Sequence, residues 1–186
     1  MELMDAIRHR RSVRAFTDAP VPKEVLLGLV DAATLAPSAN NAEHWHFTII
    51  QNQALLDRIS DASKAHMLKV TDLASAGSRV REHLTAASDF HVFYHAPAVI
   101  LISTLSGDFA IEDAALAAEN LMLAARGQGL GTCWIGFAQK WLETAEGKQA
   151  VELDPHYIPV APIIVGTPKG ETPPVPRKTP AVHWID

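Results

Sequence analysis

The stretch between residues 98 and 125 limits the possible folds more than any other part of the chain. It begins with a continuous apolar run at residues 98–102, which is typical of a central, buried strand. It continues with apolar residues at helical spacing, many of them alanines that favour close packing against another helix or a second subunit: Ile111, Ala114, Ala115, Ala118, Leu121, Met122 and Ala125. A buried strand followed by a buried helix predicts a fold that mixes α and β structure.

The other apolar patterns agree with this interpretation. Helical spacing predicts a helix that begins near Pro22 and ends before Pro37, and a leading helix that ends near His9 with Leu3 and Ile7 facing inward. The remaining expectations are strands at residues 45–49, 132–135 and 163–165, a loop at 37–44, a short helix around 141–142, and a broken helical region at 52–89.

Composition describes one globular domain spanning residues 1–186, with 48% hydrophobic and 20% charged residues. A net charge of -5 argues against nucleic acid as a partner. The single cysteine, Cys133, lies in an apolar strand and is expected to pack in the core. Because no signal-like or membrane-spanning run is present, we expect a cytoplasmic protein with no membrane partner.

The last twenty residues differ from the rest of the chain. Residues 167–186 contain five of the twelve prolines and few apolar side chains, so they cannot form a core of their own. We therefore expect an extended tail that lies on another surface.

Arg8, Arg10, Arg11 and Arg14 concentrate positive charge in an otherwise acidic chain. Guanidinium groups match phosphate oxygens with paired hydrogen bonds, so the cluster is a candidate phosphate site. The alternative is a solvated basic surface, which is the commoner reason for a run of charges.

The histidines do not form a metal motif. His91 and His95 stand four residues apart, but Val92 occupies the position where a zinc protease helix has Glu. His44 and His46 lack a carboxylate or thiol cluster to complete a site. We therefore assign no metal.

The sequence also shows no set of nucleophile, base and acid, which favours chemistry carried by a cofactor.

Five segments follow one another in a characteristic order. They are RRSVRAF at residues 10–16, APSANN at 36–41 leading into WHF at 45–47, HAP at 95–97, GLGTCWIG at 129–136, and PRK at 176–178 with HW at 183–184. Their order and spacing resemble those of the FMN-dependent nitroreductase family. The resemblance covers essentially the whole chain.

This resemblance implies an α+β fold, with a central mixed, mainly antiparallel sheet between helices in a three-layer sandwich. It also implies an intertwined homodimer in which the tail wraps the partner. The implied activity is ping-pong hydride transfer from NADH or NADPH, through N5 of FMN, to nitroaromatic, quinone or similar electron-poor acceptors. Two alternatives stay open: a specialised flavin enzyme acting on one metabolite by dehalogenation, dehydrogenation or flavin breakdown, and a non-catalytic flavin-binding protein.

The resemblance also implies roles for individual residues. Arg10, Arg11 and Ser12 would meet the phosphate and ribityl chain, and Arg177, with Lys178, would return from the tail to the phosphate. No side chain is assigned as a certain catalytic residue, but Arg14 and the backbone of Gly136 would support chemistry at flavin N5. The full expected cofactor-binding set is Arg10, Arg11, Ser12, Arg14, Pro37, Ser38, Asn41, Trp134, Ile135, Gly136, Arg177 and Lys178, with Ser38 and Asn41 supplied by the other subunit.

Two departures from the family pattern change the expected pocket. Glu43 and His44 stand where family members often have Gln-Pro, and Phe137 stands where a second Gly is common. Residues 65–90 match no family landmark, in a region that helps to define the substrate channel. The sequence therefore predicts an acceptor site without predicting the acceptor.

Overall fold

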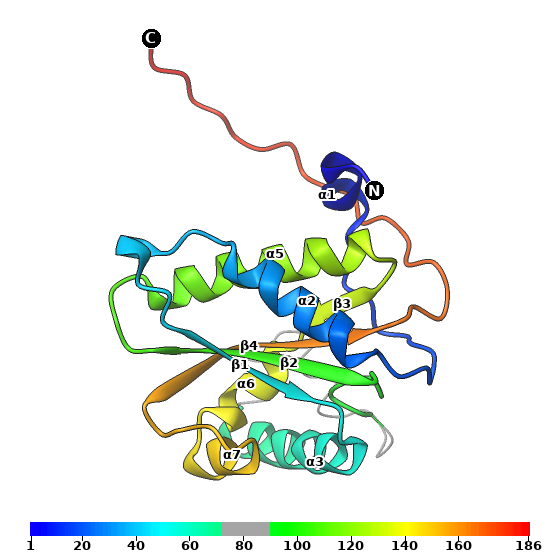
Figure 1. Ribbon diagram of the computed structural model, residues 1–186, viewed down its shortest axis with the longest axis vertical. Helices are drawn as coiled ribbons and strands as arrows, with labels where there is room; N and C mark the ends of the chain where they lie inside the picture. The colour runs from blue at the N-terminus through cyan, green and yellow to red at the C-terminus, as the bar shows by residue number, and fades with distance from the viewer. Residues whose placement is uncertain (72–89) are drawn as a thin grey trace.

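A four-stranded sheet with helices on both faces forms the centre of the molecule (Figure 1). The computed structural model describes residues 1–71 and 90–186. The strands are β1 (Trp45–Ile50), β2 (Ala98–Leu105), β3 (Gly131–Trp134) and β4 (Tyr157–Gly166), in the spatial order β1-β2-β4-β3. All three strand pairings are antiparallel, which confirms the predicted α+β class with a mainly antiparallel sheet.

The helices divide between the two faces of the sheet. Figure 1 shows α2 and α5 on one face and α3, α6 and α7 on the other. The bounds of the helices are α1 (Leu3–His9), α2 (Lys23–Thr34), η1 (Ala39–Asn41), α3 (Gln53–Val70), α5 (Ala110–Gly127), α6 (Gly136–Leu142) and α7 (Ala145–Ala150). Among the described residues, no helix is long and apolar enough to cross a membrane.

The continuous apolar run in β2 follows from this layering. Successive side chains of a strand point to opposite faces. Ile100 and Ile102 therefore belong to the core on the α2 and α5 side, and Val99 and Leu101 belong to the core on the α3 and α6 side. A strand covered on both faces needs apolar residues at every position, which confirms the predicted central strand.

Helix α5 packs on the sheet mainly through small residues. Ala114, Ala118 and Ala125 are fully buried beside Leu121, and the short side chains allow α2 to lie close to α5. The predicted burial fails near the start of this helix, since Ile111 is 58% exposed and Ala115 is only partly buried. Helical spacing shows which face is apolar, but it does not show where the covering elements end.

Strand β4 is longer than the predicted strand at 163–165. Its first half contains Pro159 and Pro162, although proline is rare in a central strand because it cannot donate a ladder hydrogen bond. The structure accommodates Pro159 opposite Ser103, where the pairing with β2 shifts register. The predicted short helix at 141–142 is in fact two helices, α6 and α7, separated where Thr144 caps α7 through a 3.0 Å bond from the Gly147 N–H.

The two ends of the chain expose apolar side chains. Leu3 and Ile7 were expected to face inward, but in the single chain their side chains are 67% and 46% exposed. Ala6 is the buried residue of α1. The expectation is therefore wrong for the isolated chain. Figure 1 shows the tail leading away from the sheet, and Trp184 and Ile185 are more than 80% exposed. The tail is extended as predicted, and its contact with a partner stays a prediction.

The broken helical region predicted at 52–89 is confirmed only in its first part. It corresponds to α3 as far as Val70. The predicted breaks, and most of the unmatched region at 65–90, lie outside the described residues.

Candidate functional site

A cavity of about 650 Å³ opens beside the loop that follows α1. Small-molecule sites commonly enclose roughly 300–1,000 Å³. Its walls come from three distant parts of the chain: Arg10 and Arg11 after α1, Arg126 and Leu130 around the turn into β3, and tail residues such as Thr172. The structure thus brings two of the four clustered arginines, Arg10 and Arg11, together with the start of the tail, while Arg8 and Arg14 do not line this cavity.

Close backbone packing holds the loop after α1, residues 10–14, against β3. Ser12 forms a parallel bridge with Thr132, and the N–H of Val13 donates to the Thr132 carbonyl oxygen at 3.0 Å. A Cβ on Gly131 would lie 2.8 Å from the Val13 side chain, so only glycine permits this approach. The position of Arg10 and Arg11 is therefore fixed by the sheet edge.

The start of the tail is fixed to the same loop. The N–H of Thr17 donates to the Thr167 carbonyl oxygen at 2.9 Å, and the N–H of Lys169 donates to the Ala15 carbonyl oxygen at 3.0 Å. Phe16 and Pro168 form an antiparallel bridge between these bonds. The first residues of the tail are thus a structural wall of the cavity.

Arg10 and Arg11 already make bonds within the chain. The Arg10 Nε donates to Glu119 Oε1 at 3.1 Å, while Arg11 Nη1 donates to the carbonyl oxygens of Arg8 and Arg10 at 2.7 and 2.8 Å. A guanidinium group has five N–H donors, so both side chains keep donors for a ligand.

Arg126 was not predicted as a site residue. It lies in the last turn of α5 and lines the same cavity as Arg10 and Arg11. Its Nε is buried, and no hydrogen-bond partner is present in the part of the chain that the structure describes. An arginine in the last turn of a helix is common for electrostatic reasons, so the sequence carried no signal that would single it out.

An aromatic cluster lies between Arg14 and the residue that follows the predicted ring-binding segment. The Arg14 guanidinium lies 5.9 Å from the ring centroid of Tyr94 and donates from Nη1 to the Ser12 carbonyl oxygen at 3.3 Å. Phe90 makes edge contacts with Tyr94 and Phe137, with centroids 5.7 and 6.2 Å apart. Phe137 directly follows the predicted segment of Trp134, Ile135 and Gly136. The three rings therefore connect Arg14 to the start of α6.

Gly136 differs from the prediction in its local structure. It was expected at a strand end, but β3 ends at Trp134 and Gly136 is the first residue of α6. Its N–H therefore has no carbonyl partner within the helix. A Cβ placed on Gly136 would meet no atom within 4 Å, so the residue faces open space.

Pro37, Ser38 and Asn41 lie at the opposite end of α5. The N–H of Ala39 donates to both carboxylate oxygens of Asp113, at 3.0 and 3.2 Å, and this fixes the loop to the first turn of the helix. Asp113 in that turn and Arg126 are thirteen positions apart, which is about 20 Å at 1.5 Å per residue. One chain does not bring this loop to the cavity, and its supply by a second subunit stays a prediction.

Arg177 and Lys178 are not brought to the cavity either. Both are exposed in the tail beyond Pro174, which is the last tail residue that lines the cavity. Their predicted contact with the phosphate is untested.

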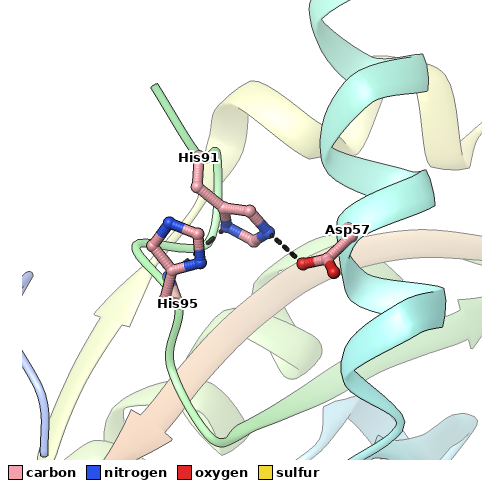
Figure 2. Close-up of side chains that lie close together, drawn as sticks. All are labelled: Asp57, His91 and His95. Atoms are coloured by element: carbon pink, nitrogen blue, oxygen red, sulfur yellow. Dashed lines mark hydrogen bonds and ion pairs between the residues drawn. The ribbon is translucent and has the colours of Figure 1, made fainter. Parts of the chain in front are cut away.

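A histidine cluster lies on the α3 side of the sheet (Figure 2). His91 Nε2 lies 3.0 Å from Asp57 Oδ1, and His91 Nδ1 accepts the backbone N–H groups of Phe93 and His95 at 3.2 and 3.4 Å. Because Nδ1 is an acceptor, the neutral ring carries its proton on Nε2 and donates it to Asp57. Burial lowers the pKa of His91 below 6.5, and His95 lowers it further, while Asp57 opposes both.

These bonds bear on the predicted absence of a metal. Asp57, His91 and His95 place three potential ligand atoms within 4.8 Å of one another. A histidine that binds metal through one nitrogen normally donates an N–H from the other. His91 accepts at Nδ1 instead, so its bonds favour a proton donor over a metal ligand. The assignment of no metal stays a prediction.

Comparison with known proteins gives a consistent result. The model of the Nitroreductase family matches residues 7–167. YodC of Bacillus subtilis, provisionally named an NAD(P)H nitroreductase, is 30% identical over 189 residues, with 88% of each chain covered.

Solved structures show the same similarity. An FMN-dependent nitroreductase from Clostridium difficile is 25% identical, with a TM-score of 0.83 over 99% of both chains. An iodotyrosine deiodinase bound to FMN and 3-iodo-L-tyrosine is also 25% identical, with a TM-score of 0.80 over 100% of both chains. A Bacteroides fragilis nitroreductase with bound FMN shares the fold, with a TM-score of 0.86 and 24% identity over 100% of both chains.

Proposed function

The chain belongs to the nitroreductase family, and on this premise we propose that it is an FMN-dependent oxidoreductase. It takes hydride from NADH or NADPH and passes electrons to a second, electron-poor acceptor such as a nitroaromatic or a quinone. The observation that carries the proposal is the cavity lined by Arg10, Arg11 and Arg126 in a chain of net charge -5. Two solved relatives with 25% identity are described as FMN-dependent or FMN-bound.

The residues present fit the phosphate end of FMN. Arg10 is partly buried, with 22% of its side chain exposed, so a bond from it to an anion would be less screened than at the surface. Arg10 and Arg11 would bind the phosphate through the donors that their internal bonds leave free, and Ser12 would lie beside the ribityl chain. Charge-assisted bonds of this kind are about twice as strong as neutral ones.

The aromatic cluster would bind the ring end. FMN, when bound, supplies reversible hydride uptake at its N5 atom. The N–H of Gly136 would donate to N5, and the neighbouring backbone of Trp134 and Ile135 would support the ring. The Arg14 guanidinium would place positive charge beside the pyrimidine side, which favours electron uptake.

A homodimer is part of the proposal. The exposed apolar side chains of α1 and of the tail, including Ile7 and Trp184, would be buried between two copies. Pro37, Ser38 and Asn41 of one copy would then reach the cofactor of the other, and Arg177 and Lys178 would approach the phosphate from the tail. This arrangement accounts for the distance of about 20 Å between that loop and the cavity within one chain.

One observation favours a second candidate function. The similarity to iodotyrosine deiodinase equals the similarity to the Clostridium difficile nitroreductase in identity and nearly equals it in TM-score. An enzyme that acts on a single metabolite is therefore the alternative. Phe137, which replaces the family's common second glycine, packs against Phe90 near Gly136 and would narrow the acceptor site in either case.

The test starts with the colour of the purified protein. We expect it to release FMN, identified by chromatography, when it is denatured. Without air, NADH or NADPH should bleach the yellow protein, and a nitroaromatic, a quinone or 3-iodo-L-tyrosine should restore the colour according to the acceptor used. A protein that binds no FMN in a titration would overturn the proposal, while a yellow protein that is not bleached would be a non-catalytic flavin-binding protein.

A further inference from the structure

We propose that Arg126 is a third guanidinium ligand of the cofactor phosphate, and that it makes the site selective for FMN over riboflavin, which lacks the phosphate. The inference rests on the proposed function, because it requires that the phosphate of FMN occupies the cavity beside Arg10 and Arg11. Arg126 lies outside every sequence motif that pointed to the cofactor. Its role follows from its position and from its missing partner.

The first argument is the missing partner. The Arg126 Nε is buried, and the structure contains no hydrogen-bond partner for it in residues 1–71 or 90–186. A buried donor on a charged group is costly to leave unpaired. The guanidinium faces a cavity, so a ligand there can supply the acceptor that the chain does not.

The second argument is the charge of the surroundings. Arg10 and Arg11 line the same cavity, together with the carboxylate of Glu171. Glu119 is paired with Arg10 at 3.1 Å. No carboxylate of the described segments forms an ion pair with Arg126. Three guanidinium groups and one carboxylate leave the cavity with an excess of positive charge, which a bound anion would offset. A phosphate carries enough charge and enough acceptor oxygens to satisfy all three.

The third argument is that Arg126 is held in place. It follows Ala125, which is fully buried, and the carbonyl oxygen of Ala125 accepts the N–H of Leu130 at 2.9 Å. Gly129, with φ of 78°, allows the turn between them. The base of the side chain is therefore fixed between α5 and β3, and little ordering is needed when a phosphate binds.

A purely structural role gives a different expectation. A positive charge in the last turn stabilises a helix through its dipole. Such a role would make Arg126 important for the stability of α5, but it would not distinguish FMN from riboflavin. The ratio of the two affinities therefore separates the two roles.

The experiment measures FMN and riboflavin binding to the full-length apoprotein by quenching of flavin fluorescence. Arg126→Gln should weaken FMN binding about ten- to a hundredfold, the effect of losing one charge-assisted bond, and should change riboflavin binding less than about twofold. Arg10→Gln serves as the reference and should show the same selectivity. Arg58→Gln removes an equal charge beside a different cavity, between α3, α6 and α7, and should change neither affinity.

Arg126→Lys keeps the charge and the helix-dipole interaction but lacks the planar fork, so it should retain part of the preference for FMN. If circular dichroism shows that Arg126→Gln does not fold, the Arg126→Lys variant replaces it in the comparison of FMN and riboflavin affinities. Equal weakening of FMN and riboflavin in the folded variants, or no weakening of either, would overturn the role of Arg126. If the wild-type protein itself binds no FMN, the proposed function fails, and the role of Arg126 fails with it; the two failures are distinguished by the wild-type titration.

Discussion

The two ends of α5 hold buried charged groups in opposite states. In the first turn, Asp113 is 7% exposed and its two carboxylate oxygens accept the N–H of Ala39. In the last turn, Arg126 has a buried Nε that no described group accepts from. A buried polar group that is hydrogen-bonded within the chain fixes the structure around it, whereas a charged donor that lacks a partner and lines a cavity can bind an external acceptor.

The surroundings of the two ends differ in the same way. At the Asp113 end, the loop is fixed by a local bond from the Glu43 N–H to Ser38 Oγ at 3.2 Å and by the bonds from the Ala39 N–H to Asp113, 74 positions away. At the Arg126 end, the walls come from the first 13 residues of the chain, from the turn into β3 and from the tail. Both ends therefore depend on contacts between distant parts of the chain, but the cavity end leaves a donor of a charged group without a partner among the described residues.

The largest effect is expected from removing the tail. A chain cut after Gly166 loses the cavity wall between Thr167 and Pro174 together with the bond from Lys169 N–H to the Ala15 carbonyl oxygen. We expect FMN affinity to fall by more than about a hundredfold, because the wall and several phosphate donors are lost together. Dimerisation, measured by light scattering, should be lost as well, since Trp184 and Ile185 would no longer cover a partner.

A shorter truncation separates the two roles of the tail. A chain cut after Pro174 keeps the wall but lacks Arg177, Lys178 and the exposed apolar end. If the tail arginine binds phosphate, FMN affinity should fall about tenfold or more while riboflavin affinity changes less. A full-length protein that is a monomer, or a chain cut after Gly166 that stays dimeric and yellow, would contradict the exchanged tail.

The next effect concerns the first turn of α5, where the Asp113 carboxylate accepts the Ala39 N–H. Asp113→Ala leaves the Ala39 N–H without its acceptor, and we expect the free energy of unfolding to fall by about 1–3 kcal/mol. The measurement is urea denaturation of the apoprotein. Asp31→Ala, at an exposed position on α2, is the matched control and should change the stability by less than about 0.5 kcal/mol. Equal effects of the two substitutions would show that the Asp113 bonds do not stabilise the loop.

A smaller effect is expected at Gly136. Gly136→Pro removes the N–H, and proline fits the first position of a helix, so the fold should persist. We expect bleaching by NADH to slow about tenfold, the value of one hydrogen bond. Gly136→Ala keeps the N–H, and its Cβ would meet no atom within 4 Å, so its rate should stay near that of the parent. Equal rates in the parent and a correctly folded Gly136→Pro variant would remove the N–H from the mechanism.

Sequence patterns predicted the elements whose periodicity reflects burial within the chain. The apolar run of β2 and the small residues of α5 are examples, because both are covered by the same chain. Leu3 and Ile7 show the limit of this reasoning: the pattern marks an apolar face, but it does not say whether the covering surface belongs to the same molecule. Pro159 shows another limit, since its place in a central strand depends on a register shift that only the pairing with β2 reveals.

The candidate site divides in a similar way. Arg10 and Arg11 were predicted because their charge reverses the sign of the chain locally, and such a signal is visible in the sequence. Arg126 and Asp57 were not, because each is defined by contacts with residues far away along the chain. Asp57 lies 34 positions from His91, and no spacing rule connects a helix to a loop across that interval.

The smallest effect concerns His91, whose ring bonds, like those of Asp113, are completed within the chain. Its folded pKa lies below 6.5, so the unfolded chain takes up the proton first and the fold loses stability as the pH falls below 6.5. Asp57→Asn removes a negative charge that raises this pKa, so the His91 resonances should titrate at still lower pH in an NMR experiment. Asp31→Asn removes the same charge from an exposed position on α2, on the other face of the sheet, and it should leave the titration unchanged. The accompanying loss of stability should stay below about 1 kcal/mol, because the Asp57 carboxylate is exposed. If the pKa of His91 rises or stays constant in Asp57→Asn, Asp57 does not stabilise the protonated ring. The contrast with the unpaired Arg126 would then not apply to His91 on the α3 side of the sheet.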